Sequence, residues 1–283
     1  MKKENFETSN TSPFVKWAGG KRQLLPEIKK MLPETFKTYY EPFVGGGAVL
    51  FELQPKKAVF GDINEELVGT YKNIKENKDE LIELLDEYTK NHNDAKDKKE
   101  YFYSLRDEYN EEILVNPSSV KCSALFIYLN KTCFNGLYRV NANGLFNVPF
   151  NNKEKVRLYN LDNLNNISKY LKNAKIKCCD FEETCKNAKK EDFVFFDSPY
   201  APLKDTSFES YTKEGFSLEN HQRLARLYKK LSDKGVYCML TNHNTDLINE
   251  LYKDFNIKAV QVKRLINSDA NNRKGEEVII TNY

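Results

Sequence analysis

The stretch EPFVGGGAVL, residues 41–50, decides the fold of this chain. A short apolar and aromatic run, residues 39–43, leads into three glycines and then into residues that favour a helix. Glycines allow a tight turn and a close approach of the backbone to a ligand, as at the nucleotide-binding turns of α/β sheets. The pattern G-x-G-x-x-G is incomplete, because Leu50 stands at its last position. The stretch therefore indicates a strand, a turn and a helix, and leaves open whether the turn binds a ligand.

The segments on both sides of this stretch continue the alternation of strands and helices. Residues 14–17 and 58–60 are predicted strands, and residues 22–31 between them are a predicted helix. Beyond residue 175, apolar runs predict strands over 193–196, 236–240, 257–262 and 278–281, and helices around 224–231 and 247–253. Such an alternation is typical of an α/β fold with a parallel sheet. We therefore expect residues 12–75 and 175–283 to build one open sheet.

The region between these two segments has a different character. Helices are predicted over residues 81–88, 100–115 and 123–130, and a hairpin joins residues 137–140 to 145–148 through an Asn-Gly turn. This pattern divides the chain into three parts. We expect residues 1–75 to be the first part of a catalytic domain, residues 76–174 an insertion, and residues 175–283 the second part of the catalytic domain.

Charge is unevenly distributed along the chain. The 283 residues include 44 Lys and Arg and 41 Asp and Glu, a net charge of only +3. Residues 62–112 nevertheless contain eight basic and sixteen acidic residues, whereas residues 120–177 contain ten basic and two acidic residues. Residues 256–275 add five basic residues and one acidic residue. A basic recognition face with acidic helices elsewhere is typical of a protein that binds nucleic acid.

Composition excludes several other classes of protein. A hydrophobic content of 40% is enough to bury a core, and no run approaches the ~20 apolar residues that span a bilayer. The first residues lack the apolar segment of a signal peptide, so we expect a cytoplasmic protein without membrane association. The six cysteines have no C-x-x-C spacing and the three histidines are scattered, which predicts no metal site. Cys178 and Cys179 are expected to be a buried strand end rather than a redox pair.

A second glycine-containing segment, KWAGGKRQLL at residues 16–25, resembles a phosphate-binding loop but does not match it. Val15 stands where the first glycine would be, and Arg22 replaces the Ser or Thr that follows the lysine. An ATPase function is therefore disfavoured. Lys21 could pair with a carboxylate of a ligand. Trp17 could pack against a ligand or belong to the core, and the segment alone does not decide.

The most specific motif is FVFFDSPY, residues 193–200. An apolar strand delivers Asp197 to the carboxyl edge of the sheet, where ligands bind in open α/β folds. The Asp197 carboxylate and a backbone carbonyl of the turn can accept the two N–H bonds of a planar amine such as adenine N6. Pro199 fixes the backbone φ angle, and Tyr200 offers a ring face for stacking a base. A capped strand end without function is the alternative.

Residues 129–150, LNKTCFNGLYRVNANGLFNVPF, mix asparagines, an arginine and aromatic rings in predicted loops. Such side chains suit hydrogen bonding to base edges and stacking on bases. The candidates are Phe134, Asn135, Arg139 and Asn141. The asparagines could instead serve only as turn formers. The basic charge of this region favours the nucleic-acid interpretation.

Together, the motifs PFVKWAGGK, EPFVGGGA, GDINEEL, FNGLYRVN, FNVPF, DFVFFDSPYAPL and EEVIITNY resemble the Dam-like DNA adenine-N6 methyltransferases of the GATC-modifying type. The resemblance covers nearly the whole chain in the family's order. It implies a Rossmann-like α/β sheet that binds S-adenosylmethionine (AdoMet). It also implies that the insertion, residues 76–174, is a helical and β-hairpin target-recognition domain that binds double-stranded DNA.

The resemblance also implies roles for individual residues. AdoMet would be bound by Trp17, Lys21, Phe43, Gly45, Gly46, Gly47, Asp62, Asp180, Phe181 and Asp197. A flipped adenine would be held by Asp197, Ser198, Pro199 and Tyr200. Duplex DNA would be contacted by Lys16, Phe134, Asn135, Leu137, Arg139 and Pro149, and by Arg273 and Lys274 of a basic C-terminal loop. Lys16 and Arg139 match positions that read guanines in GATC-specific members.

Two departures from the family pattern bear on the expected function. Ser198 stands where the motif D-P-P-Y has a proline, and Asn-Asn-Lys at residues 151–153 replaces the usual glycine and basic-aromatic pair. We expect a monomeric adenine-N6 methyltransferase with weakened or normal catalysis, and a separate cognate restriction endonuclease is compatible with the sequence. Alternatives are a sequence-specific DNA-binding protein that retains AdoMet with weak or lost transfer because of Ser198, and a methyltransferase for another planar amine.

Overall fold

The computed structural model describes residues 11–283 except residues 18, 20, 22, 204–215 and 264–273. The strands are β1 (Tyr39–Glu41), β2 (Ala58–Asp62), β3 (Lys175–Cys178), β4 (Phe193–Phe196), β5 (Tyr237–His243), β6 (Asn256–Lys263) and β7 (Lys274–Thr281). They form one seven-stranded sheet in the order β3-β2-β1-β4-β5-β7-β6. The first five strands of this order are parallel, and β7 pairs antiparallel with β5 and β6. The predicted Rossmann-like α/β fold is confirmed.

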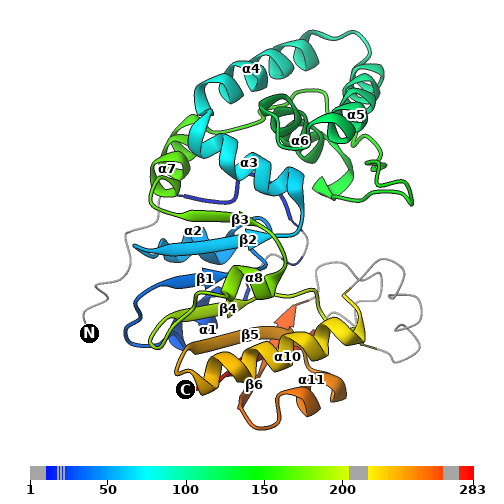
Figure 1. Ribbon diagram of the computed structural model, residues 1–283. Helices are drawn as coiled ribbons and strands as arrows, with labels where there is room; N and C mark the ends of the chain where they lie inside the picture. Colours follow the sequence, from blue (N-terminus) through cyan, green and yellow to red (C-terminus); the bar gives the residue numbers. More distant parts are fainter. Residues whose placement is uncertain (1–10, 18, 20, 22, 204–215, 264–273) are drawn as a thin grey trace.

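The helices cover both faces of the sheet and extend beyond one of its edges (Figure 1). They are α1 (Leu25–Lys30), α2 (Ala48–Leu53), α3 (Glu65–Glu76), α4 (Lys78–Asp94), α5 (Lys98–Val115), α6 (Val120–Thr132), η1 (Phe134–Gly136), α7 (Leu161–Leu171), α8 (Phe181–Cys185), α10 (Leu218–Asp233) and α11 (Asp246–Leu251). Helices α8, α10 and α11 lie on one face and α1 and α2 on the other, while α4, α5 and α6 lie beyond the β3 edge. Side chains of Asn64, Asp97, Ser119, Asn160, Ser217 and Thr245 cap helix N-termini.

Strand β4 shows why the sheet lies at the centre of the molecule. Phe193 and Phe195 belong to the apolar core on one face, and Val194 and Phe196 to the core on the other. A strand that is apolar at every position fits only a sheet covered on both sides. Within the described residues, the strands come from chain segments 39–62 and 175–281, and the intervening residues 76–174 contribute helices and isolated bridges. The functional division of the chain stays a prediction.

Some local predictions were wrong. Residues 14–17 form no strand, because the backbone of Lys16 bonds the side chain of Asn130 instead of a neighbouring strand. The predicted hairpin is reduced to one bridge, Val140 to Phe146. Asn141 Oδ1 accepts backbone N–H bonds at its turn and competes with a longer ladder. Cys178 ends β3 but is exposed, because β3 is an edge strand.

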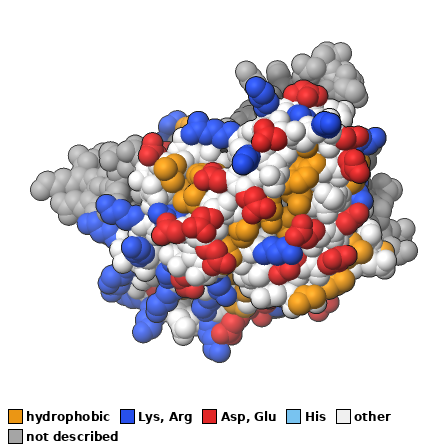
Figure 2. Space-filling model, turned by 90° about the horizontal axis from the view of Figure 1, so that it is seen from above, with side chains coloured by type: hydrophobic (Ala, Val, Ile, Leu, Met, Phe, Trp, Pro, Cys, Tyr) orange, Lys and Arg blue, Asp and Glu red, His pale blue; other side chains and the backbone are white. Residues whose placement is uncertain are grey.

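Positive and negative side chains are not evenly mixed on the surface. Figure 2 looks down on the part of the molecule beyond the β3 edge. Asp and Glu side chains and apolar patches share the centre of this face, whereas Lys and Arg side chains gather toward one side. The uneven charge of the sequence therefore persists on the folded surface.

Candidate active site

A cavity of about 1100 Å³ lies where β1, β2 and β4 end. Its lining includes every residue predicted for the AdoMet and adenine sites except Gly47: Trp17, Lys21, Phe43, Gly45, Gly46, Asp62, Asp180, Phe181, Asp197, Ser198, Pro199 and Tyr200. The parallel strands place their carboxyl ends at one edge, so segments far apart in the sequence meet there. Several apolar side chains and a few converging polar groups are typical of a small-molecule site.

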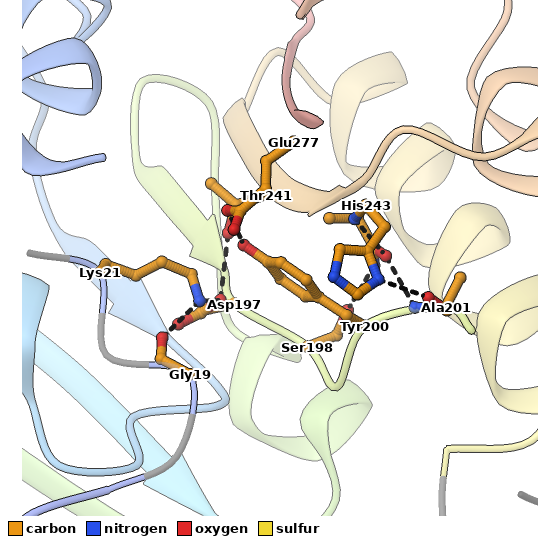
Figure 3. Close-up of polar contacts among 10 residues, drawn as sticks. Gly19, Lys21, Asp197, Ser198, Tyr200, Ala201, Thr241, His243 and Glu277 are labelled. Carbon is orange, nitrogen blue, oxygen red and sulfur yellow. Dashed lines mark hydrogen bonds and ion pairs between the residues drawn. The ribbon is translucent and has the colours of Figure 1, made fainter. Parts of the chain in front are cut away.

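Asp197 is the polar centre of this cavity (Figure 3). Its Oδ1 atom lies 2.7 Å from Lys21 Nζ and accepts a hydrogen bond of 3.1 Å from Thr241 Oγ1. Burial raises the pKa of the Asp197 carboxyl above its ordinary value, and the Lys21 ammonium acts in the opposite direction. The structure therefore pairs Lys21 with the Asp197 carboxylate of the protein itself, whereas the sequence suggested that Lys21 pairs with a carboxylate of a ligand.

Tyr200 is fixed beside Asp197 by three neighbours. Its hydroxyl donates to Glu277 Oε2 at 2.8 Å, and the His243 ring meets the tyrosine ring edge to face at 4.8 Å. Lys21 Nζ lies 4.5 Å from the centre of the Tyr200 ring. The Lys21 ammonium therefore occupies a position between a carboxylate and an aromatic face, which is the environment expected for a bound planar amine.

The Ser198-Pro199 turn is held from strand β5. Asn242, which is fully buried, accepts the Ala201 N–H at 2.8 Å, and its Nδ2 atom lies 3.5 Å from Ser198 Oγ. Ser198 is itself buried, and these contacts hold the turn where the motif D-P-P-Y would have a proline ring. No hydrogen bond to the Ser198 carbonyl is found among the described residues.

The three glycines at residues 45–47, which we call the glycine loop, are required by close contacts with other parts of the protein. Gly45 has a φ angle of +48°, and a Cβ atom there would lie 2.6 Å from Trp17 Cδ1. Gly47 has a φ angle of +74°, and a Cβ atom would lie 2.6 Å from the Tyr71 hydroxyl. The Asp62 carboxylate accepts the Gly45 N–H at 3.0 Å and so ties β2 to the loop. Gly47 thus serves the loop's structure and lies outside the cavity lining.

An aromatic cluster forms the other end of the cavity. Phe43 stacks on Phe181 at 5.3 Å, and Phe216 meets Phe43 edge to face at 5.7 Å. Asp180 pairs with Arg223 at 3.0 Å, and the Arg223 guanidinium lies 4.9 Å from the centre of the Phe181 ring. Flat apolar rings beside charged groups suit a planar heterocycle with polar edges.

Several lining residues escaped the sequence analysis. Ile63 follows Asp62 and is 79% exposed, which is unusual for a large apolar side chain that lines a cavity. In the sequence, the position of Ile63 directly after the predicted ligand-binding residue Asp62 could have indicated that it lines the cavity. Glu41 is buried and accepts the Tyr39 hydroxyl at 2.8 Å, and burial raises its pKa well above the ordinary value. Phe216 and Lys131 carry no local signal, because they reach the cavity from distant elements.

The loop 133–150, which we call the recognition loop, carries most of the predicted DNA-contacting residues: Phe134, Asn135, Leu137, Arg139 and Pro149. Phe134 and Leu137 are 48% and 40% exposed, although both are large and apolar. Arg139 Nε donates to Asn147 Oδ1 at 2.7 Å. Lys16 joins this loop, because a Cβ atom on Gly136 would lie 2.6 Å from Lys16 Cδ.

Two of the predicted DNA contacts cannot be placed. Arg273 lies outside the described residues, and Lys274 begins β7 without a described side chain. Over the described ranges, no group of three or more His, Cys, Asp or Glu side chains is arranged to hold a metal ion. In the same part of the chain, no helix combines the length and apolar character needed to cross a membrane.

Comparison with known proteins gives consistent matches. Residues 17–266 match the family model for D12 class N6 adenine-specific DNA methyltransferases. The chain is 44% identical to the type II methyltransferase M1.LlaDCHI of Lactococcus lactis subsp. cremoris, over 97% of this chain and 96% of that protein. It is 46% identical to the type II methyltransferase M.MjaIII of Methanocaldococcus jannaschii, over 96% and 99%. It is 32% identical to the DNA adenine methylase of Escherichia coli K12, over 95% and 94%.

Proposed function

This chain belongs to the D12 class N6 adenine-specific DNA methyltransferase family, and from that premise we propose that it methylates N6 of an adenine flipped out of duplex DNA, within GATC. The observation that carries the proposal is the position of Asp197. Its carboxylate lies at the end of β4, beside the Tyr200 ring, in the cavity that the glycine loop also lines. This reaction needs a hydrogen-bond acceptor for the amine, an aromatic surface on which the base stacks, and a loop whose backbone can lie close to the cofactor.

The lining of the cavity fits AdoMet. Ile63 presents an exposed apolar surface next to the Asp62 carboxylate, a pair that suits the flat base and the hydroxyls of a nucleoside. We assign the site to Trp17, Lys21, Phe43, Gly45, Gly46, Asp62, Asp180, Phe181 and Asp197, with Gly47 shaping the loop and Ile63 and Phe216 added from the structure. When bound, AdoMet supplies an electrophilic methyl group on a sulfonium.

The protein's own groups orient the target amine. Adenine N6 is a weak nucleophile, because its lone pair is delocalised into the ring. The Asp197 carboxylate and the Ser198 carbonyl would accept its two N–H bonds, and Tyr200 would stack on the base. Two oriented acceptors direct the lone pair toward the methyl donor, so the enzyme contributes position and electrostatics. Extruding the base costs a few kcal/mol of unstacking.

We assign sequence reading to the insertion and its recognition loop. The exposed Phe134 ring and the exposed Leu137 side chain suit contact with unstacked bases. Lys16 and Arg139 suit hydrogen bonding to guanine edges. Asn135, Pro149, Arg273 and Lys274 complete the proposed DNA contacts. The relatives named type II methyltransferases support a restriction–modification role, in which a cognate endonuclease would act separately from a monomeric methyltransferase.

The proposed function is tested by expressing the protein in a host that lacks adenine methylation and mapping modified bases in its genome. We expect N6-methyladenine at GATC sites and none in the same host without the gene. Methylation at another adenine site would overturn only the assigned sequence. Purified protein that binds a specific duplex but transfers no tritiated methyl group would instead support the DNA-binding alternative motivated by Ser198.

Lys131 is a proposed phosphate contact with a measurable consequence. It lines the cavity and an adjoining one of about 400 Å³, and burial, Lys16 and Lys153 all lower its pKa. No ion pair to it is found in the part of the chain that the structure describes. A partly buried cation faced by like charges is stabilised by an anion, and the DNA backbone supplies phosphates.

We expect Lys131→Gln to weaken binding equally for GATC and non-GATC duplexes, and to reduce the slope of log affinity against log salt by about one. Fluorescence anisotropy over a salt series measures both. Lys230→Gln, an exposed lysine on α10, is the matched control and should leave the slope unchanged. A loss confined to the GATC duplex would contradict the phosphate assignment.

A further inference from the structure

Asn130, a buried asparagine near the C-terminal end of α6, joins two segments that the sequence separates by more than one hundred residues. Its Oδ1 atom accepts the Lys16 N–H at 2.8 Å. Its Nδ2 atom donates to the Lys16 carbonyl at 2.8 Å and to the Gly136 carbonyl at 3.0 Å. Asn130 is only 3% exposed, and its bond to the Gly136 carbonyl is buried while the two to Lys16 are partly buried. The side chain therefore fastens the Lys16 backbone to the recognition loop.

The two residues at this attachment face different sites. The Lys16 side chain crosses Gly136, where a Cβ atom would lie 2.6 Å from Lys16 Cδ, and Gly136 has a φ angle of +67°. Trp17, the next residue, lines the large cavity and contacts the glycine loop at Gly45. One short segment thus presents one side chain to the recognition loop and the following one to the cavity.

A second contact joins the same two sites. The Trp17 ring stacks on Tyr138 of the recognition loop, with ring centres 5.5 Å apart and planes 26° from parallel. Tyr138 lies between Leu137 and Arg139, two of the proposed DNA contacts. Moving the Trp17 ring would therefore disturb both the glycine loop and the centre of the recognition loop.

We propose that Asn130 is a positioning residue that couples occupancy of the cavity to DNA recognition, by locking the Lys16-Trp17 backbone to Gly136. The proposal rests on the function proposed above. A ligand that orders Trp17 orders the segment attached to Asn130, and with it Lys16 and the recognition loop. Coupling of this kind is reciprocal, so duplex DNA strengthens cofactor binding by the same factor.

The coupling is measured with S-adenosylhomocysteine, which cannot donate a methyl group, and a GATC duplex. Trp17 is the only tryptophan of the chain, so its fluorescence reports binding at the cavity. The coupling factor is the ratio of the dissociation constants for S-adenosylhomocysteine without and with saturating duplex. We expect a factor of at least about fivefold for the wild type. In Asn130→Ala and Asn130→Asp it should fall close to one.

A control separates coupling from folding. Asn73 is also buried and donates to Ser118 O, Ser119 O and Ser123 Oγ, but it joins α3 to α6 away from both sites. Asn73→Ala should lower the unfolding midpoint as much as Asn130→Ala and keep the wild-type coupling factor. Asn130→Asp keeps the shape of the side chain and the acceptor for Lys16 N–H, and gives a second variant if alanine does not fold.

The outcomes are distinct. A wild-type coupling factor in folded Asn130 variants, or equal loss of coupling in Asn73→Ala, would overturn the assignment. A wild-type factor of one would overturn it while the methylation test leaves the proposed function intact. Failure of the wild type both to bind S-adenosylhomocysteine and to methylate DNA would reject the proposed function, and the coupling with it.

Discussion

Asp197→Ala is expected to lower methyl transfer to duplex DNA by at least about a hundredfold, because it removes an oriented acceptor from the proposed reacting centre. The carboxylate lies deep in the cavity and contacts Lys21 and Thr241, whereas the proposed DNA contacts lie on the recognition loop. Duplex binding should therefore be largely retained. Single-turnover transfer of tritiated methyl groups measures the rate, and anisotropy measures the affinity.

The matched control for this prediction lies at the opposite end of the same strand. Asp192 is buried, and its carboxylate accepts backbone N–H bonds from Thr38 and Lys189. Asp192→Ala should destabilise the fold and leave the rate constant of the folded fraction near the wild-type value. Wild-type turnover by Asp197→Ala would show that its carboxylate has no part in the reaction.

Several strands of the sheet were predictable, because a strand that is covered on both faces reads as an apolar run. The runs at residues 193–196 and 236–240 became β4 and β5 with boundaries shifted by at most three residues. Three of the four residues in segment 14–17 are also apolar, yet Phe14 and Val15 fill the core from an irregular segment. Apolar character predicts burial, and it does not show whether the backbone bonds to a strand or to the side chain of Asn130.

The site was predictable where a motif brings its own geometry, and less so where partners come from elsewhere. Asp197 and Tyr200 were identified because strand and turn place them at the sheet edge. Glu277, which accepts the Tyr200 hydroxyl from 77 residues away, carries no local pattern. The sequence did not identify Asp197 as the partner of Lys21 for the same reason. Contacts between residues so far apart in the sequence depend on the order of the strands in the sheet, and the spacing of residues along the chain does not reveal that order.

Lys21→Met is expected to move the acid limb of the pH–rate profile upward by about one to three units, the range over which a neighbouring opposite charge shifts a carboxyl pKa. Burial already raises the pKa of Asp197, and Lys21 is the leading influence that lowers it. In the proposed role the carboxylate is the active form, because a protonated carboxyl would offer a weaker acceptor to the adenine amine. A higher pKa therefore removes activity at low pH and restores it as the pH rises. Rates at saturating AdoMet and DNA, over a pH series, measure the limb.

The position of Lys21 makes the direction of this shift informative. Its ammonium lies 2.7 Å from Asp197 Oδ1 and 4.5 Å from the centre of the Tyr200 ring, where the target amine would bind. If the Lys21 ammonium only occupied the position of the target amine, its removal would speed entry of the base and would leave the acid limb of the pH–rate profile unshifted. If it keeps Asp197 ionised, the limb moves up and activity returns at high pH. Lys21→Arg retains the charge, so its limb should remain near that of the wild type even where its rate falls. An unshifted limb in Lys21→Met would instead assign the ionisation of Asp197 to its hydrogen bond from Thr241.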